Sequence, residues 1–203
     1  MSRFIQVFHK YHKDISMLHF LDMLEEIREK LDAEQAYGSI AFPYFIEKKA
    51  PVTESEGIME YNCSYEGEVR EGGKKRLFYV SIAVPIATLC PCSKAISDYG
   101  AHNQRGLVKV KLLYKEFFWI EDVIQMIEGC ASTPLYSVLK RKDEKYVTEH
   151  AYDNPRFVED VVREVYLGLK EMGFDWFSVE AETDESIHYH NAYAYTEYDS
   201  KNK

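Results

Sequence analysis

Hydrophobic and polar residues alternate along much of this chain with the two-residue period of strands that bury one face. The alternation is plain in residues 4–8 and again in residues 108–112. Turn-forming residues separate such runs, as in the segment 50–56. We therefore expect strands at 4–8, 38–48, 57–69, 77–89, 107–114, 174–181 and 192–198.

Other segments carry apolar residues at the three-to-four-residue spacing of an amphipathic helix. Ser16 offers an N-cap to one of them, and Asn154 with Pro155 opens another, which Gly173 closes. The segment that starts at Ser16 carries a stripe of apolar residues that we expect to face the core: Met17, Phe20, Leu21, Leu24, Ile27 and Leu31. We expect helices at 16–31, 120–128, 133–141 and 155–172, and a loop over 142–154.

The order of these elements indicates two similar halves. Before about residue 74 it is strand, helix, strand, strand, and afterwards strand, strand, helix, helix, strand, strand. Residues 71–76 suit both a boundary between the halves and an ordinary hairpin turn. The sequence thus predicts an α+β fold in two modules, 1–72 and 73–203, the first without its opening strand.

Composition limits the class of protein. The 203 residues are 46% hydrophobic and include 16 Tyr and 11 Phe, enough for a sizeable core. A net charge of −9 argues against a general nucleic-acid or anionic-membrane binder, although a local basic pocket can still hold a polyphosphate. The absence of a long apolar run and of a signal sequence favours a cytoplasmic protein, and four cysteines are too few for a disulfide scaffold.

Candidate chemistry is concentrated in residues 89–106, between two predicted strands. Cys90 and Cys92 flank Pro91, which cannot lie in a central strand, so we expect an accessible loop there. With His102 and a carboxylate from elsewhere, a cysteine thiolate forms a catalytic zinc-type ligand set that leaves one position open. The alternative is a pair of small buried side chains in a tight turn.

This stretch, together with residues 139–149, 154–160 and 185–192, closely resembles the signatures of the IB-type GTP cyclohydrolases, in the same order. The resemblance implies a bimodular tunnelling fold of antiparallel sheets backed by helices. It also implies conversion of GTP and water to 7,8-dihydroneopterin triphosphate and formate, the first step of folate synthesis, by a homotetramer. Met1 stands where family members have an interior methionine, so the resemblance suggests that the first module lacks its N-terminal part.

The resemblance also assigns a metal site. It makes Cys90, His102 and Glu144 the ligands of a divalent metal, which can be zinc, manganese or iron. Glu149 is the rival carboxylate, and without the resemblance Glu144 reads as one more solvated charge in a charged run.

Other residues are assigned to the substrate and to proton transfer. Glu159 would anchor the adjacent ring N–H and amine of guanine, with Asp160 as the alternative. His188 and His190, two residues apart, would share one face beside Glu185 and carry protons or bind metal. Cys92 is a second thiol for catalysis, and the triphosphate would meet Lys94 and Arg105, with Lys140, Arg141 and Arg163 also near in sequence.

Two other functions fit these residues. One is the related archaeal enzyme, which makes a cyclic phosphate from GTP. The other is a binding module without activity, in which Cys90 and His102 hold a structural zinc ion.

Overall fold

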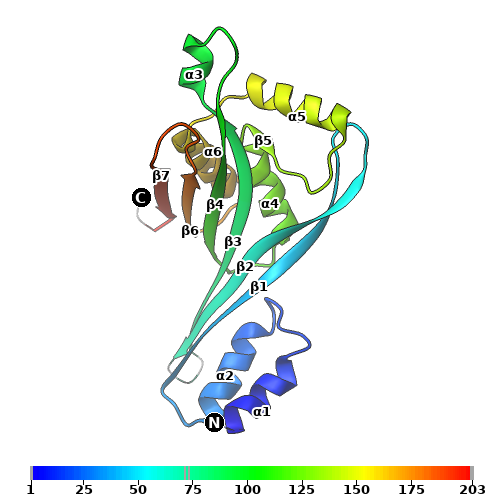
Figure 1. Cartoon of the computed structure of the whole chain (residues 1–203). Coiled ribbons are helices and arrows are strands. Elements are labelled where there is room, and N and C mark those ends of the chain that lie inside the picture. The colour runs from blue at the N-terminus through cyan, green and yellow to red at the C-terminus, as the bar shows by residue number, and fades with distance from the viewer. Residues whose placement is uncertain (1, 71, 73, 202–203) are drawn as a thin grey trace.

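The computed structural model describes residues 2–70, 72 and 74–201. Its centre is an antiparallel sheet with the strand order β1-β2-β3-β4-β6-β7, and β5 pairs with β3 beside this path (Figure 1). The strands are β1 Gln35–Lys49, β2 Glu56–Arg70, β3 Lys75–Leu89, β4 Asn103–Leu113, β5 Thr133–Pro134, β6 Trp176–Thr183 and β7 Ala192–Asp199. The helices are α1 Ser2–Tyr11, α2 Phe20–Lys30, α3 Pro91–Ile96, α4 Ile120–Gly129, α5 Arg141–Asp153 and α6 Val158–Glu171. A mixed fold of helices and antiparallel strands is thereby confirmed.

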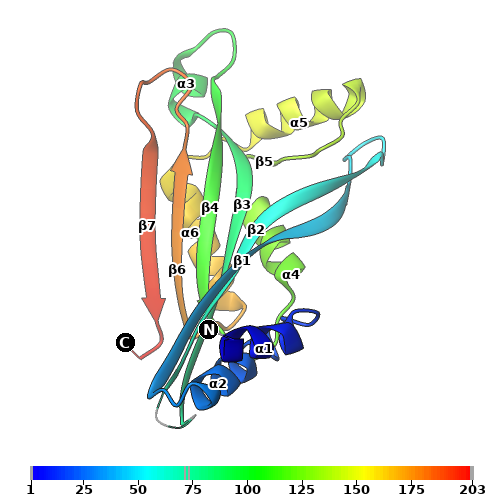
Figure 2. The same ribbon diagram turned by 60° about the horizontal axis from the view of Figure 1, so that its bottom comes forward.

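One face of the sheet carries the core. In β3, every second residue from Phe78 to Ile86 is buried, which is the period expected of a strand with one covered face. Apolar residues of α2, α4 and α6 pack on this face, and Figure 2 shows α4 and α6 on one side of the strands. The opposite face carries cross-strand ion pairs, such as Lys111 with Glu66 at 2.7 Å.

The strand predicted at 4–8 is wrong, because these residues lie in helix α1. Phe4, Val7, Phe8 and Tyr11 have the spacing of a helix face, and Val7 is fully buried. The side chain of Lys10 also bonds to Glu26 of α2 at 2.6 Å. Residues 4–8 therefore add no strand to the sheet.

The assignments for residues 133–154 are also wrong. Thr133–Pro134 forms the short strand β5, which pairs with Ala87 and Ile86 of β3, and no helix spans 133–140 in the structure. The predicted loop 142–154 is instead helix α5. In both places a contact with a distant strand or loop decides the conformation, and a local pattern does not contain such a contact.

The other predicted elements are confirmed with shifted ends. Helix α2 begins at Phe20, four residues after Ser16. Its predicted stripe lies in or against the core except for Leu31, which is exposed at the end of the helix. Helix α6 begins at Val158, where Asp160 rather than Asn154 supplies the cap by accepting the Phe157 N–H, and Gly173 closes it with a φ of 85°.

The segment 71–76 is a hairpin, since Arg70 of β2 pairs with Lys75 of β3; residues 71 and 73 themselves lie outside the described residues. The division into modules 1–72 and 73–203 stays a prediction. No helix in the described part of the chain is long and apolar enough to cross a membrane.

Candidate active site

The site is built at the end of the β3–β4 ladder. The last ladder pair is Leu89 with Asn103, and the pairing continues one step further, because the Cys90 N–H donates to the His102 carbonyl at 3.0 Å. Cys90 and His102 are twelve positions apart in sequence but directly opposite each other in space. The strand ends thus place Cys90 and His102, the two residues that the sequence singled out, at paired backbone positions.

The residues between them are not wholly a loop as expected. Pro91 opens the short helix α3, where its missing N–H costs nothing, and the Cys90 sulfur accepts the Ser93 N–H at 3.4 Å as the cap. Cys92 is exposed on this helix. The Lys94 ammonium bonds to the Tyr152 carbonyl of α5 and lies 4.2 Å from the centre of the Tyr152 ring, so Lys94 ties α3 to α5.

The His102 ring is oriented by two neighbours. Its Nδ1 lies 3.2 Å from Gln104 Oε1 and 3.2 Å from Ser186 Oγ. A proton on Nδ1 bonds to these oxygens and leaves the lone pair of Nε2 for a ligand, which is the usual arrangement of a metal-binding histidine.

Ser186 belongs to the turn between β6 and β7 that carries the other histidines. The turn is fixed to the motif strand, since the Asp184 N–H donates to the Arg105 carbonyl at 2.8 Å. Glu185 accepts the Thr183 hydroxyl at 2.9 Å. The rings of His188 and His190 stack with centres 5.1 Å apart, so they share one face as the spacing predicted.

Helix α5 forms a wall beside the motif (Figure 1). One hollow is lined by Thr148, Glu149, Tyr152 and Asp153 of α5 and by residues on both sides of His102, namely Leu89, Tyr99, Gly100, Ala101 and Asn103. A second, of about 540 Å³, lies between Thr148 and the strand residues Gln104 and Arg105, and Ser186 also lines it. Glu144 lies elsewhere on the helix, in a hollow lined by α5 alone. Of the two α5 glutamates that the sequence proposed as ligands, Glu149 therefore shares a hollow with the neighbours of His102, as does Asp153.

The residues present fit a metal only in part. Cys90 and His102 are adjacent, and thiolate with imidazole suits zinc and related ions. Among the described residues, however, no three side chains of His, Cys, Asp or Glu lie close enough together to hold an ion. The carboxylate, whether Glu144 or Glu149, does not complete the set in this conformation.

The two carboxylates at the start of α6 differ in how they are used. Asp160 accepts the Phe157 N–H at 3.1 Å and pairs with Arg163 at 3.0 Å. Glu159 is exposed, and in the described part of the chain no hydrogen bond or ion pair engages it. Glu159 therefore keeps both oxygens for a ligand.

Two features of the site escaped the sequence reasoning. Gln104 and Ser186 orient the His102 ring. Both lie within the motif segments 89–106 and 185–192, but no role was assigned to either of them. Thr88, which lines the second hollow, is fully buried, and its hydroxyl has no partner among the described residues. A buried hydroxyl without a partner is costly, so Thr88 is a candidate contact for a polar group in this hollow. No pattern in the sequence distinguishes it from a core threonine.

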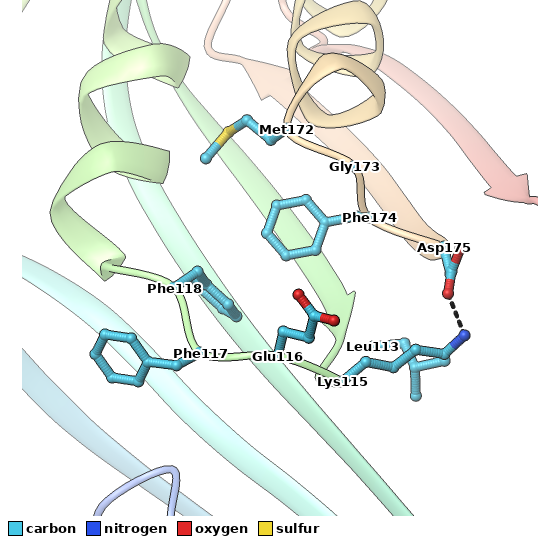
Figure 3. A pocket seen from close by; sticks show the side chains of 9 residues that line it. All are labelled: Leu113, Lys115, Glu116, Phe117, Phe118, Met172, Gly173, Phe174 and Asp175. Carbon is cyan, nitrogen blue, oxygen red and sulfur yellow. Dashed lines mark hydrogen bonds and ion pairs between the residues drawn. The ribbon is translucent and has the colours of Figure 1, made fainter.

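A further hollow lies at the opposite end of β4, between the segment after β4 and the turn before β6 (Figure 3). Phe118 and Phe174 face each other across it, and Lys115 pairs with Asp175 at its edge. None of the predicted site residues lines it.

The geometry defines an α+β protein with a candidate enzyme site, in which Cys90 and His102 pair at one end of the sheet beside a hollow that Glu149 of α5 lines. The profile of the family described as type I GTP cyclohydrolase folE2 matches residues 1–194. GTP cyclohydrolase FolE2 of Geotalea uraniireducens (strain Rf4) is 50% identical over 100% of this chain and 74% of its own length. The FolE2 protein of Syntrophus aciditrophicus (strain SB) is 54% identical over 97% of this chain and 77% of its own length. The chain belongs to the type I GTP cyclohydrolase FolE2 family, which confirms the class of enzyme that the motifs indicated.

Proposed function

We propose that this chain is a GTP cyclohydrolase of folate biosynthesis, which converts GTP and water to 7,8-dihydroneopterin triphosphate and formate. The family membership supports the reaction. The observation that carries the assignment to this site is the backbone pairing of Cys90 with His102 at the end of the β3–β4 ladder. The IB type and the tunnelling fold are the finer form of the same proposal.

The proposed metal set is Cys90, His102 and one carboxylate of α5. The motif favours Glu144 and the hollow beside His102 favours Glu149. These residues would hold a divalent cation, which would supply the Lewis acidity that hydration of guanine C8 requires. Zinc, manganese and iron all accept such ligands.

The remaining groups bind the substrate and move protons. Glu159 holds the guanine edge through two parallel hydrogen bonds, for which its oxygens are free of other partners in the described chain. His188 and His190 exchange protons with the opening ring, with Glu185 beside them, and Cys92 stands next to the Cys90 ligand.

For the triphosphate, Arg105 is better placed than Lys94. Arg105 lines the second hollow, whereas the Lys94 ammonium bonds to the Tyr152 carbonyl. Cytoplasmic location and a homotetramer belong to the same proposal.

The test is a formate-release assay with GTP, on protein whose metal content has been measured, followed by analysis of the product. A product that keeps its triphosphate supports the proposal. A cyclic phosphate would point to the archaeal type of reaction, and stoichiometric zinc without formate release would point to a binding module.

A further inference from the structure

Helix α5 lines the hollows of the candidate site, yet little of it is buried. Of its 13 residues, Arg141 to Asp153, only Asp143 and Ala151 are buried. A helix that buries so few apolar groups gains little from hydrophobic packing. Its position must therefore depend on specific contacts.

The principal contact at its first turn is made by the Asp143 carboxylate, whose residue has no exposed surface. Oδ1 accepts the N–H groups of Val52 and Thr53 at 2.9 and 2.8 Å. Oδ2 accepts the Thr53 hydroxyl at 2.6 Å and the Lys140 N–H at 2.9 Å. Only the bond from Lys140 caps the helix. The other three join α5 to the loop at the tip of the β1–β2 hairpin (Figure 1).

These bonds keep the carboxylate charged. Burial alone would raise the pKa of Asp143, but the Thr53 hydroxyl and the N–H groups of Lys140, Thr53 and Val52 outweigh it and hold the pKa well below its ordinary value. Each bond is therefore made to an ionised acceptor, which makes it stronger than a neutral one.

An aspartate also caps α6, but its bonds stay within that helix. Asp160 accepts the Phe157 N–H and pairs with Arg163, both local to its own helix. Helix α6 is held instead by buried apolar residues, including Val161 and Leu169. Asp143 thus does more than cap a helix, because it binds a second element.

That second element is itself fixed to the core. Near the tip of the hairpin, the Lys48 ammonium bonds to both Glu128 oxygens at 2.6 Å and to the Leu135 carbonyl at 2.8 Å. Glu128 lies in α4, which packs on β3. The hairpin tip is therefore a firm support for α5.

We propose that Asp143 is a positioning residue of the site. It holds the first turn of α5 against the hairpin tip, and so sets where Glu144 and Glu149 stand relative to Cys90 and His102. This rests on the proposed function, in which α5 supplies the carboxylate of the metal set. Asp143 itself touches neither substrate nor metal.

The test is Asp143→Asn, which keeps the size of the side chain but must turn an amide NH₂ toward groups that also donate. We expect the affinity for Zn²⁺, measured by competition with a chelator, to fall about 10- to 100-fold, the usual cost of losing an outer-shell partner. Hydrogen exchange in α5 should accelerate at least about tenfold while α6 is unchanged. With GTP, kcat should fall more than KM rises.

Glu25→Gln is the matched control, since it also disrupts a partly buried carboxylate, which accepts the Arg28 guanidinium at 2.7 Å within α2, and leaves α5 and the hairpin tip untouched. It should lower the thermal midpoint comparably and leave Zn²⁺ affinity and α5 exchange unchanged. Thr53→Val removes one donor from the other side of the link and should give a smaller effect than Asp143→Asn in the same direction. Thr53→Val also carries the test if Asp143→Asn does not fold.

The outcomes separate this inference from the proposed function. If Asp143→Asn loses only stability, as Glu25→Gln does, while the double variant Glu144→Ala, Glu149→Ala loses Zn²⁺, the positioning role is overturned and the metal set stands. If the double variant keeps its Zn²⁺ affinity, α5 supplies no ligand, and the role given to Asp143 falls with that part of the proposed function.

Discussion

The Cys90 side chain has two tasks in this structure, and they can be separated by substitution. Its sulfur caps α3 by accepting the Ser93 N–H, and it is the proposed metal ligand. A serine hydroxyl can still cap the helix but is a poor ligand for a soft ion. We therefore expect Cys90→Ser and Cys90→Ala both to lose Zn²⁺ affinity by more than the roughly 100-fold of an outer-shell change.

Formate release should fall with the metal, while the thermal midpoint of metal-free Cys90→Ser stays near that of the metal-free parent. Cys130→Ala serves as the control, because that thiol is part of the core periphery and bonds to the Met126 carbonyl. Normal metal content in Cys90→Ala would show that Cys90 is not a ligand.

A second prediction at this scale concerns Glu159. Glu159→Gln removes the charge and one acceptor without disturbing any bond of the described chain. The KM for GTP should rise roughly 10- to 100-fold, the loss expected for hydrogen bonds to a charged group. Metal content and thermal midpoint should not change.

Glu171→Gln, at the exposed far end of α6, is the matched control. An unchanged KM in Glu159→Gln, with a raised KM in Asp160→Asn, would move the guanine anchor to Asp160.

Residue types and spacing predicted part of this site, and the strand ladder explains which part. Cys90 and His102 lie at the two ends of the segment that connects β3 to β4. The pairing of these two strands is therefore enough to place the two residues opposite each other. The contact of Ser186 with His102 spans 84 positions and depends on the pairing of β4 with β6. Such a contact cannot be derived from spacing, and for the same reason the α5 carboxylate remained ambiguous.

Among the elements, the strands followed from alternation because one face of the sheet is more covered than the other, fully in β3 and partly in the outer strands β1 and β7. The wrong assignments fall where hydrophobic periodicity is a weak signal. Residues 4–8 are too few to separate a period of two from the helical set Phe4, Val7, Phe8 and Tyr11. Helix α5 has only a short apolar face, Val147 and Ala151, and its main anchor is a buried carboxylate, so hydrophobic periodicity did not identify it.

The docking of α2 on the β1–β2 hairpin gives a prediction for an element. A Cβ added at Gly67 would lie 2.8 Å from Phe20 and 2.9 Å from Leu21, and one at Gly38 would lie 2.6 Å from Leu24. The glycines let the helix approach the strands closely. Gly67→Val should therefore destabilise the fold by about 1–3 kcal/mol through overpacking, a loss of several degrees in thermal midpoint.

Gly129→Ala is the control for this substitution, because a Cβ there meets nothing within 4 Å. Zn²⁺ affinity should stay unchanged in Gly67→Val, since α2 lies far from the strand ends that carry the motif (Figure 1). A stable Gly67→Val would mean that α2 is not packed as closely as the structure has it.

On the scale of the whole molecule, the core is unusually rich in aromatic and ionisable side chains. Tyr65 lies between Phe42 and Phe78, in edge contacts with centres 4.7 and 5.3 Å apart, and Cys63 precedes it on the same face of β2. Burial raises the pKa of Tyr65 to about 12, with a contribution from Cys63, and burial raises the pKa of the Cys63 thiol to about 12. The core thus prefers both groups neutral.

This gives the fold a limit at alkaline pH. Well below about pH 8.5, the ordinary pKa of a thiol, both groups are protonated in the folded and unfolded chain, so they add no pH dependence. Between the ordinary pKa values and about 12, the unfolded chain releases protons that the folded chain retains, so the free energy of unfolding falls as the pH rises.

Tyr65→Phe removes one of these groups together with a hydroxyl that sits in an apolar site. We expect its alkaline unfolding midpoint to move upward by about 0.3–1 pH unit, measured by circular dichroism, with little change at pH 7. Tyr37→Phe, on an exposed tyrosine of β1, should leave the midpoint where it is. Equal midpoints for Tyr65→Phe and the parent would show that another group, Cys63 first, sets the alkaline limit of the core.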